Sequence, residues 1–138
     1  MHFFTIGYGG RAPSELLSLL STAGVKTLVD VRLRPDKASM GSYAKAKTPD
    51  KGIEALLASR GIGYVSLPEL ENVFLGDADW PTLYAELIAK AGDLLTRKLA
   101  GIREPFCLMC AEKRVAECHR RIIAEFLVGH GNEVTHIE

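Results

Sequence analysis

The chain has 138 residues, 47% hydrophobic and 25% charged, a composition typical of one globular domain that buries its own core. Lys and Arg together number 17, as do Asp and Glu, so the formal net charge is zero and a broad surface for duplex nucleic acid is not indicated. No apolar run approaches the ~18 residues of a membrane helix, and the first residues lack a basic leader and an apolar core of signal length. We therefore expect a single domain over residues 1–138 and a cytoplasmic location. In that reducing compartment, the three cysteines should be thiols or ligands rather than a disulfide framework.

The first part of the chain predicts a strand, a helix and a second strand. Residues 2–6 are a strand that ends in a glycine-rich turn at residues 7–10, and Pro13 then begins a helix that Gly24 ends. Backbone can approach a ligand closely at such a turn, but the turn matches neither G-x-G-x-x-G nor a Walker pattern. It is therefore either a weak nucleotide signal or a tight strand-to-helix turn. Residues 25–31 form a near-continuous apolar run, as in strands buried on both faces of a parallel sheet.

Charged residues follow this second strand. Asp30, Arg32 and Arg34 fall on one side of the chain while it stays extended. A buried aspartate needs a partner, which Arg32 or a backbone amide can supply. The alternative is an ion pair that only ties down the loop. Residues 33–47 show no clear periodicity, and such long connections are typical of functional lids or of disordered segments.

The middle and the end of the chain continue the alternation of helices and strands. Thr48 as N-cap and Pro49 at the first helical position predict a helix that ends near Gly61. Further elements are expected at residues 63–67 (a strand), 79–95 (a helix capped by Asp79) and 133–137 (a closing strand).

The segment 106–127 contains an unusual concentration of reactive residues. Its first part is an apolar run long enough for one buried strand, and its second part has apolar residues at helical spacing, at 122, 123, 126 and 127. A short polar turn separates the two parts. The segment holds all the cysteines of the chain, Cys107, Cys110 and Cys118.

The start of the helix in this segment predicts where its side chains point. Helical periodicity directs His119 towards the sheet, sets Arg120 on the border of the apolar stripe and directs Arg121 to solvent. Cys118 falls at or next to the first helical position, where free N–H groups and the helix dipole favour an anion or a thiolate. Either these residues line a site at the end of the strand, or Cys118 and His119 are packing groups and Arg120 is a surface cap.

Several short segments follow one another along the chain: Thr5-Ile6-Gly7-Tyr8, Leu28-Val29-Asp30-Val31-Arg32, Leu67-Pro68-Glu69-Leu70, Leu108-Met109-Cys110-Ala111-Glu112-Lys113 and Cys118-His119-Arg120. In this order they resemble the DUF488 family of small proteins, which has no settled function. The resemblance covers nearly the whole chain, and its specific part is the Cys-x-Glu motif together with Cys-His-Arg. Many members have His-Ser where this chain has Tyr8-Gly9 and Gly-Gly where it has Glu71-Asn72. The resemblance implies a fold and a site rather than a particular reaction.

The order of the elements predicts an α/β fold: a single domain with a mostly parallel five-stranded sheet and helices on both faces. Ligands on such sheets bind beyond the carboxyl ends of the strands, and the chemically capable side chains of this chain gather at those ends. The candidate catalytic residues are Cys110, Glu112, Cys118 and His119. The candidate ligand-binding residues are Tyr8, Gly9, Arg11, Asp30, Arg32, Arg34, Glu69, Lys113 and Arg120.

These residues leave three functions open. The first is a small enzyme for an anionic, phosphate- or nucleotide-like substrate, with arginines on the anion, Cys110 or Cys118 as nucleophile, and His119 or Glu112 as proton carrier. The Cys-x5-Arg loop of phosphatases and rhodaneses is absent. The second is a Cys/His metal site, but Cys107 and Cys110 should point to opposite faces of their strand, so we expect no structural zinc. The third is a non-catalytic module for a small ligand, a nucleic acid or a protein partner. A small anionic ligand is the expected partner, no membrane is expected, and the sequence indicates no particular cofactor.

Overall fold

The structure is a computed structural model that describes residues 1–138. Its elements form one five-stranded sheet in the order β3-β2-β4-β1-β5, in which every pair of neighbouring strands is parallel. The helices and strands are β1 (His2–Gly7), α1 (Pro13–Ala23), β2 (Thr27–Asp30), α2 (Gly52–Ala58), β3 (Gly63–Ser66), α3 (Trp80–Leu95), β4 (Phe106–Cys110), α4 (Arg120–Gly129) and β5 (Glu133–Ile137). The predicted single-domain α/β fold with a parallel five-stranded sheet is confirmed.

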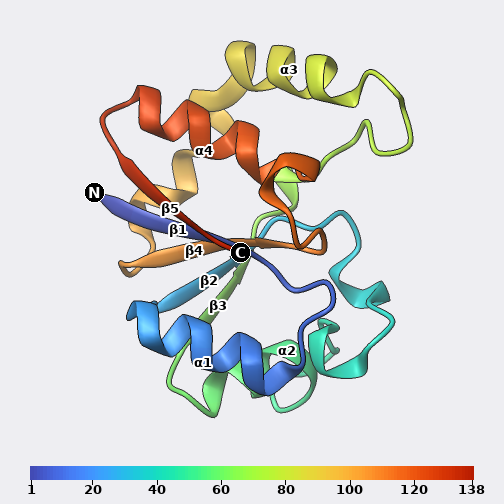
Figure 1. Cartoon of the computed structure of the whole chain (residues 1–138), viewed down its shortest axis with the longest axis vertical. Coiled ribbons are helices and arrows are strands. Elements are labelled where there is room, and N and C mark those ends of the chain that lie inside the picture. The colour runs from blue at the N-terminus through green and yellow to red at the C-terminus, as the bar shows by residue number, and fades with distance from the viewer.

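The sheet lies between two helical layers, with α1 and α2 on one face and α3 and α4 on the other (Figure 1). Each face has its own hydrophobic core, and the side chains of β4 alternate between the two. Cys107 belongs to the core under α1 and α2, and Cys110 belongs to the core under α3 and α4. The prediction that these two cysteines face opposite sides of the sheet is therefore confirmed.

The helix predicted from Thr48 begins later than expected. Helix α2 starts at Gly52, whose φ of 66° interrupts any helix running in from Pro49. The preceding residues form an irregular connection in which Gly52 bridges to Lys45. The Thr-Pro signal was wrong here because a tertiary contact fixes the backbone that follows it.

Helix α4 also begins later than the apolar periodicity indicated. Residues 115–117 form a short 3-10 turn, His119 is the N-cap, and Arg120 is the first helical residue. Cys118 therefore precedes the helix, and its Sγ accepts the backbone N–H of Arg120 at 3.4 Å. The sulfur still lies at the helix start, but it is held there by a turn rather than by the helix itself.

The carboxyl ends of the three central strands meet at one edge of the sheet. Gly7 at the end of β1 is in register with Cys110, and Asp30 at the end of β2 is in register with Met109. The loops after β1, β2 and β4 therefore leave the sheet side by side. No helix in the structure has both the length and the apolar character needed to span a membrane.

Candidate functional site

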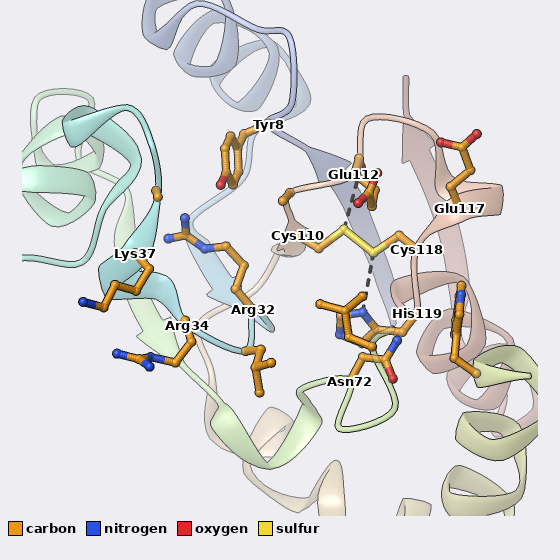
Figure 2. Close-up of a pocket in the computed structure, with 15 residues that line it drawn as sticks. Tyr8, Arg32, Arg34, Lys37, Asn72, Cys110, Glu112, Glu117, Cys118 and His119 are labelled. Carbon is orange, nitrogen blue, oxygen red and sulfur yellow. Dashed lines mark hydrogen bonds between the residues drawn. A yellow bond between two sulfur atoms is a disulfide. The ribbon is translucent and has the colours of Figure 1, made fainter. Parts of the chain in front are cut away.

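A cavity of about 310 Å³ opens at this carboxyl edge, a volume within the usual range for small-molecule sites. One wall carries the cations Arg32, Arg34 and Lys37, which follow β2 (Figure 2). The opposite wall carries sulfur, imidazole and carboxylate groups. The cavity is lined by Tyr8, Arg32, Leu33, Arg34, Lys37, Ala38, Asn72, Leu75, Trp80, Cys110, Ala111, Glu112, Glu117, Cys118 and His119.

Arg32 is the buried cation of the first wall. Its Nε and Nη2 donate to both carboxylate oxygens of Asp30, at 2.7–3.1 Å, and Tyr64 donates its hydroxyl to the same carboxylate at 2.6 Å. The guanidinium carbon lies 5.1 Å from the centre of the Tyr8 ring, which adds a cation–π contact. The third nitrogen, Nη1, is buried and has no hydrogen-bond partner. Buried donors are nearly always hydrogen-bonded, so Nη1 needs an acceptor, and the protein itself supplies none.

The ionisation of this cluster is fixed by its surroundings. Burial alone would lower the pKa of Arg32, but the hydrogen bonds and charge of Asp30 outweigh it and hold that pKa above the ordinary arginine value. Burial and the Asp30 carboxylate raise the pKa of Tyr64, so its hydroxyl stays protonated and remains a donor. Arg32 is thus a permanently charged element of the cavity wall. The other two cations differ: Arg34 is exposed and paired with exposed Asp36, and Lys37 forms no salt bridge.

The opposite wall contains a disulfide between Cys110, the last residue of β4, and Cys118. The expectation that all three cysteines are thiols or ligands was therefore wrong for this pair, and Cys107 alone is free. The turn between β4 and α4 returns Cys118 to the strand end, only eight residues along the chain. Both cysteines are almost inaccessible to solvent and yet line the cavity.

His119 lies beside the disulfide and is held as a neutral imidazole. Its Nε2–H donates to the carbonyl of Val31 at 2.9 Å, which leaves Nδ1 unprotonated and 3.7 Å from Cys118 Sγ. Burial lowers the pKa of His119 to about 4, although the carbonyls of Val31 and Leu70 favour the protonated form. The imidazole therefore presents an acceptor nitrogen to the sulfur at neutral pH.

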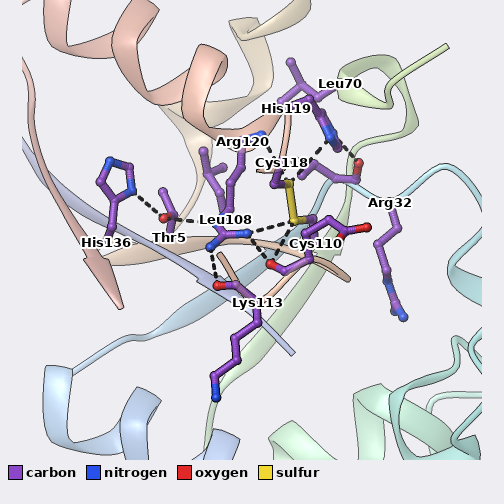
Figure 3. The surroundings of a disulfide bond; sticks show 12 residues. Thr5, Arg32, Leu70, Leu108, Cys110, Lys113, Cys118, His119, Arg120 and His136 are labelled. Atoms are coloured by element: carbon purple, nitrogen blue, oxygen red, sulfur yellow. Dashed lines mark hydrogen bonds between the residues drawn. A yellow bond between two sulfur atoms is a disulfide. The ribbon is translucent and has the colours of Figure 1, made fainter. Parts of the chain in front are cut away.

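Arg120 lies beneath the disulfide and is fully buried (Figure 3). Its guanidinium donates to Thr5 Oγ1, Cys110 Sγ and the carbonyls of Glu112 and Lys113. It does not line the cavity, so the structure does not bring it together with the predicted ligand-binding residues Tyr8, Arg32 and Arg34. It is also not the surface cap that was the alternative, because it is fully buried. Its donors are occupied by the strand end and by the loop that follows.

Gly7, at the end of β1, and Gly9, just after it, pack closely against the same loop. A Cβ on Gly7 would collide with the backbone carbonyl of Glu112, and one on Gly9 would press on the carbonyl of Ala111. The N–H of Gly9 donates to the carbonyl of Ala111 at 2.9 Å, so the turn continues the pairing of β1 with β4. Of the two alternatives for this segment, the structure shows the tight turn.

The predicted site residues thus separate into two sets. Those that line the cavity are Tyr8, Arg32, Arg34, Cys110, Glu112, Cys118 and His119. Those that do not are Gly9, Arg11, Asp30, Glu69, Lys113 and Arg120. Asp30 and Arg120 support residues of the wall from behind. Arg11 is buried against Gly7 and Glu15, whereas Glu69 pairs with Lys98.

Sequence reasoning missed several residues of the cavity. The connection between β3 and α3 contributes Asn72 and Leu75, and α3 contributes its first residue, Trp80. The long connection after β2 contributes Lys37. The available signal was the position of both connections, because each follows the carboxyl end of a strand and neither shows periodicity. Glu117, in the short polar turn between β4 and α4, was also missed.

A metal centre finds no support in this geometry. No group of three or more His, Cys, Asp and Glu side chains is placed to hold an ion. The free Cys107 is buried in the core on the other face of the sheet from Cys110 and Cys118.

The chain matches a model of a protein family. The family model described as "Domain of unknown function DUF488" matches residues 12–127, which include the cation-bearing loop, the disulfide and most of α4. No curated protein matches the chain.

Proposed function

The chain belongs to the DUF488 family, and we propose that it is a small enzyme that binds an anionic, phosphate- or nucleotide-like substrate in the cavity at the carboxyl edge of its sheet. The observation that supports this most directly is the unpartnered Nη1 of Arg32. An oxygen of a bound anion would supply the missing acceptor, because the carboxylate of Asp30 already occupies the other face of the guanidinium fork. Tyr8, which is partly exposed, would have to shift to admit it.

The distribution of charge and apolar surface supports an anion with an attached apolar body. Arg34 and Lys37 stand on the same wall as Arg32 and can meet further phosphate oxygens. Leu75 and Trp80 supply apolar and aromatic surface to the cavity. A nucleotide has both parts, a phosphate for the cationic wall and a base for the apolar and aromatic surface.

The groups that would react with the substrate are on the wall opposite the cations. They are Cys110, Cys118, His119 and Glu112, which sequence reasoning assigned to catalysis. A disulfide sulfur is not a nucleophile, so the acting form of the enzyme is the one in which this bond is reduced. A module that only binds its ligand would use the same cations, and turnover of the bound anion distinguishes the two.

The test is ligand-induced thermal stabilisation with phosphate, sulfate and a panel of nucleotides. Arg32→Lys keeps a positive charge beside Asp30 and removes the fork that carries Nη1. A charged hydrogen bond contributes about 1.5–3 kcal/mol, so we expect the affinity of Arg32→Lys for the stabilising anion to fall roughly tenfold to a hundredfold.

Arg121→Lys is the matched control. Arg121 lies in the first turn of α4 but does not line the cavity, is partly exposed, and pairs with Glu125. The Arg121→Lys variant should bind the anion with the same affinity as the unmodified chain. The proposal fails if no anion stabilises the unmodified protein, or if both lysine variants lose affinity equally.

A further inference from the structure

Arg120 is a buried cation without a bound carboxylate. Its side chain has no exposed surface, and all four of its hydrogen-bond partners are formally neutral in the oxidised protein. The carboxylates of Glu112 and Glu138 favour its charged form, but neither forms a salt bridge with it. Arg11 adds a repulsion. Burial lowers the pKa of Arg120 to about 10, so the group keeps its charge at neutral pH.

One neighbour of Arg120 can become its counter-ion. Nη1 of Arg120 lies 3.0 Å from Cys110 Sγ, which is within direct hydrogen-bond reach. If the disulfide is reduced, a thiolate at this sulfur would pair with the guanidinium without any further movement. Cys107 cannot take this role, because complete burial on the other face raises the pKa of its thiol far above the ordinary value.

The surroundings of the two sulfurs differ, and the difference distinguishes their roles. Cys110 Sγ accepts a hydrogen bond from the positively charged guanidinium of Arg120. Cys118 receives only the backbone N–H of Arg120 and faces the unprotonated Nδ1 of a neutral His119. A thiol at Cys118 is therefore expected to keep its proton and to donate it towards Nδ1, while Cys110 is deprotonated.

We propose that Cys110 and Cys118 are a reversible dithiol–disulfide couple that exchanges with small-molecule disulfides through the cavity, with Cys110 as the attacking thiolate and Arg120 as its counter-ion. The proposal goes beyond the proposed function, because it assigns a redox exchange to the two cysteines that line the same cavity. It does not require an anion on Arg32.

The exchange proceeds in two balanced steps. The Cys110 thiolate attacks one sulfur of the small disulfide, whose S–S bond breaks, so that a mixed disulfide forms and one small thiolate leaves. Cys118 then attacks Cys110 Sγ, the mixed disulfide breaks, and the proton of Cys118 leaves with the second small thiol. Two electrons pass from the protein to the reagent, and the product is the Cys110–Cys118 bond present in the structure.

The test uses the reduced full-length protein with hydroxyethyl disulfide, which is small and neutral. The unmodified chain should release two thiols per chain and retain no reagent. Cys118→Ser should release one thiol and keep the reagent on Cys110, as shown by mass spectrometry of its peptides. The rate for Cys118→Ser should rise with pH around a midpoint at least one unit below the ordinary thiol value of about 8.5.

Two further variants isolate the role of Arg120. Arg120→Gln should raise that midpoint when it is combined with Cys118→Ser, and if the combination does not fold, the midpoint of Cys118→Ser alone decides. Cys107→Ala should exchange as the unmodified chain does, since its thiol lies in the other core. Cys110→Ser should react at Cys118 roughly tenfold more slowly at neutral pH, because less of that thiol is ionised.

The proposal is overturned if Cys110 titrates at or above the ordinary value, or if Cys118 reacts as fast in Cys110→Ser as Cys110 does in Cys118→Ser. The reagent is neutral and no anion is present. Failure of exchange here and failure of anion binding in the thermal experiment are therefore separate results.

Discussion

The neutral state of His119 makes the stability of the protein depend on pH. Its pKa is about 4 in the folded protein, against about 6.5 in an unfolded chain. Between these values the unfolded state binds more protons, so the free energy of unfolding rises with pH. The stabilisation is complete above about pH 6.5 and is lost as pH falls to about 4. The total is roughly 2–4 kcal/mol.

His119→Gln should remove most of this slope, because an amide at this position does not titrate. The measurement is urea unfolding at several pH values between about 4 and 7. The pKa of His136 is also lowered by burial, so part of the slope should remain in the variant. An unchanged slope in His119→Gln would show that the imidazole is not held neutral in the fold.

At the level of single residues, the sequence identified the kinds of residues in the site but not how deeply they are buried. Helical periodicity gives the direction of Arg120 on its helix, and it cannot show that the carbonyls of Glu112 and Lys113 fold over the guanidinium. The pairing of Cys110 with Cys118 escaped prediction for a related reason. Cysteine count and compartment are averages over proteins, whereas the turn after β4 brings these two sulfurs together.

At the level of secondary-structure elements, the end of β1 and the loop after β4 lie so close together that Gly7 leaves no room for a side chain. A Cβ on Gly7 would meet backbone of Glu112 and Lys113, which cannot move aside as a flexible side chain can. Gly7→Ala should therefore lower the free energy of unfolding by about 3 kcal/mol or more. It should also displace the carbonyls that hold Arg120.

Gly41→Ala is the control for this substitution. A Cβ on Gly41 would meet no atom within 4 Å, and its backbone does not have a positive φ. Its free energy of unfolding should change by less than about 0.5 kcal/mol in denaturant titrations. Equal effects of the two substitutions would contradict the close approach of the loop to β1.

Local signals predicted elements well where no long-range contact competes with them. Pro13 and Gly24 mark the two ends of α1, with Gly24 in the left-handed conformation that ends helices. The Thr48-Pro49 signal failed because the backbone at Gly52 is fixed by its contact with Lys45 and by a hydrogen bond from Ile53 to Ala44. A capping signal describes a helix start only when the following residues are free to follow it.

At the scale of the molecule, the order of the strands is what creates the site. Strand β4 lies between β2 and β1, so the loop bearing Arg32 and the end of β4, which bears Cys110, face one another across the cavity. The sequence predicted parallel strands and the edge at which ligands bind. It could not give the order β3-β2-β4-β1-β5, because several orders bury the same apolar strands equally well.

The strand order β3-β2-β4-β1-β5 predicts which backbone amides are best protected from hydrogen exchange. Every residue of β4 is buried and the strand has neighbours on both sides, whereas β3 and β5 are edge strands with partly exposed residues. We expect the amides of β4 to exchange only through global unfolding and those of β5 to exchange through smaller openings. Mass spectrometry of exchanged peptides measures this, and equal protection of β4 and β5 would contradict the strand order.

Trp80, the only tryptophan of the chain, lines the same cavity as the disulfide. An indole reports its surroundings by its fluorescence, and a nearby disulfide quenches that emission more strongly than thiols do. The protein thus carries an intrinsic optical reporter for its own site. A stopped-flow trace of this single fluorophore can follow both the arrival of a ligand and the change in oxidation state in real time, without any attached dye.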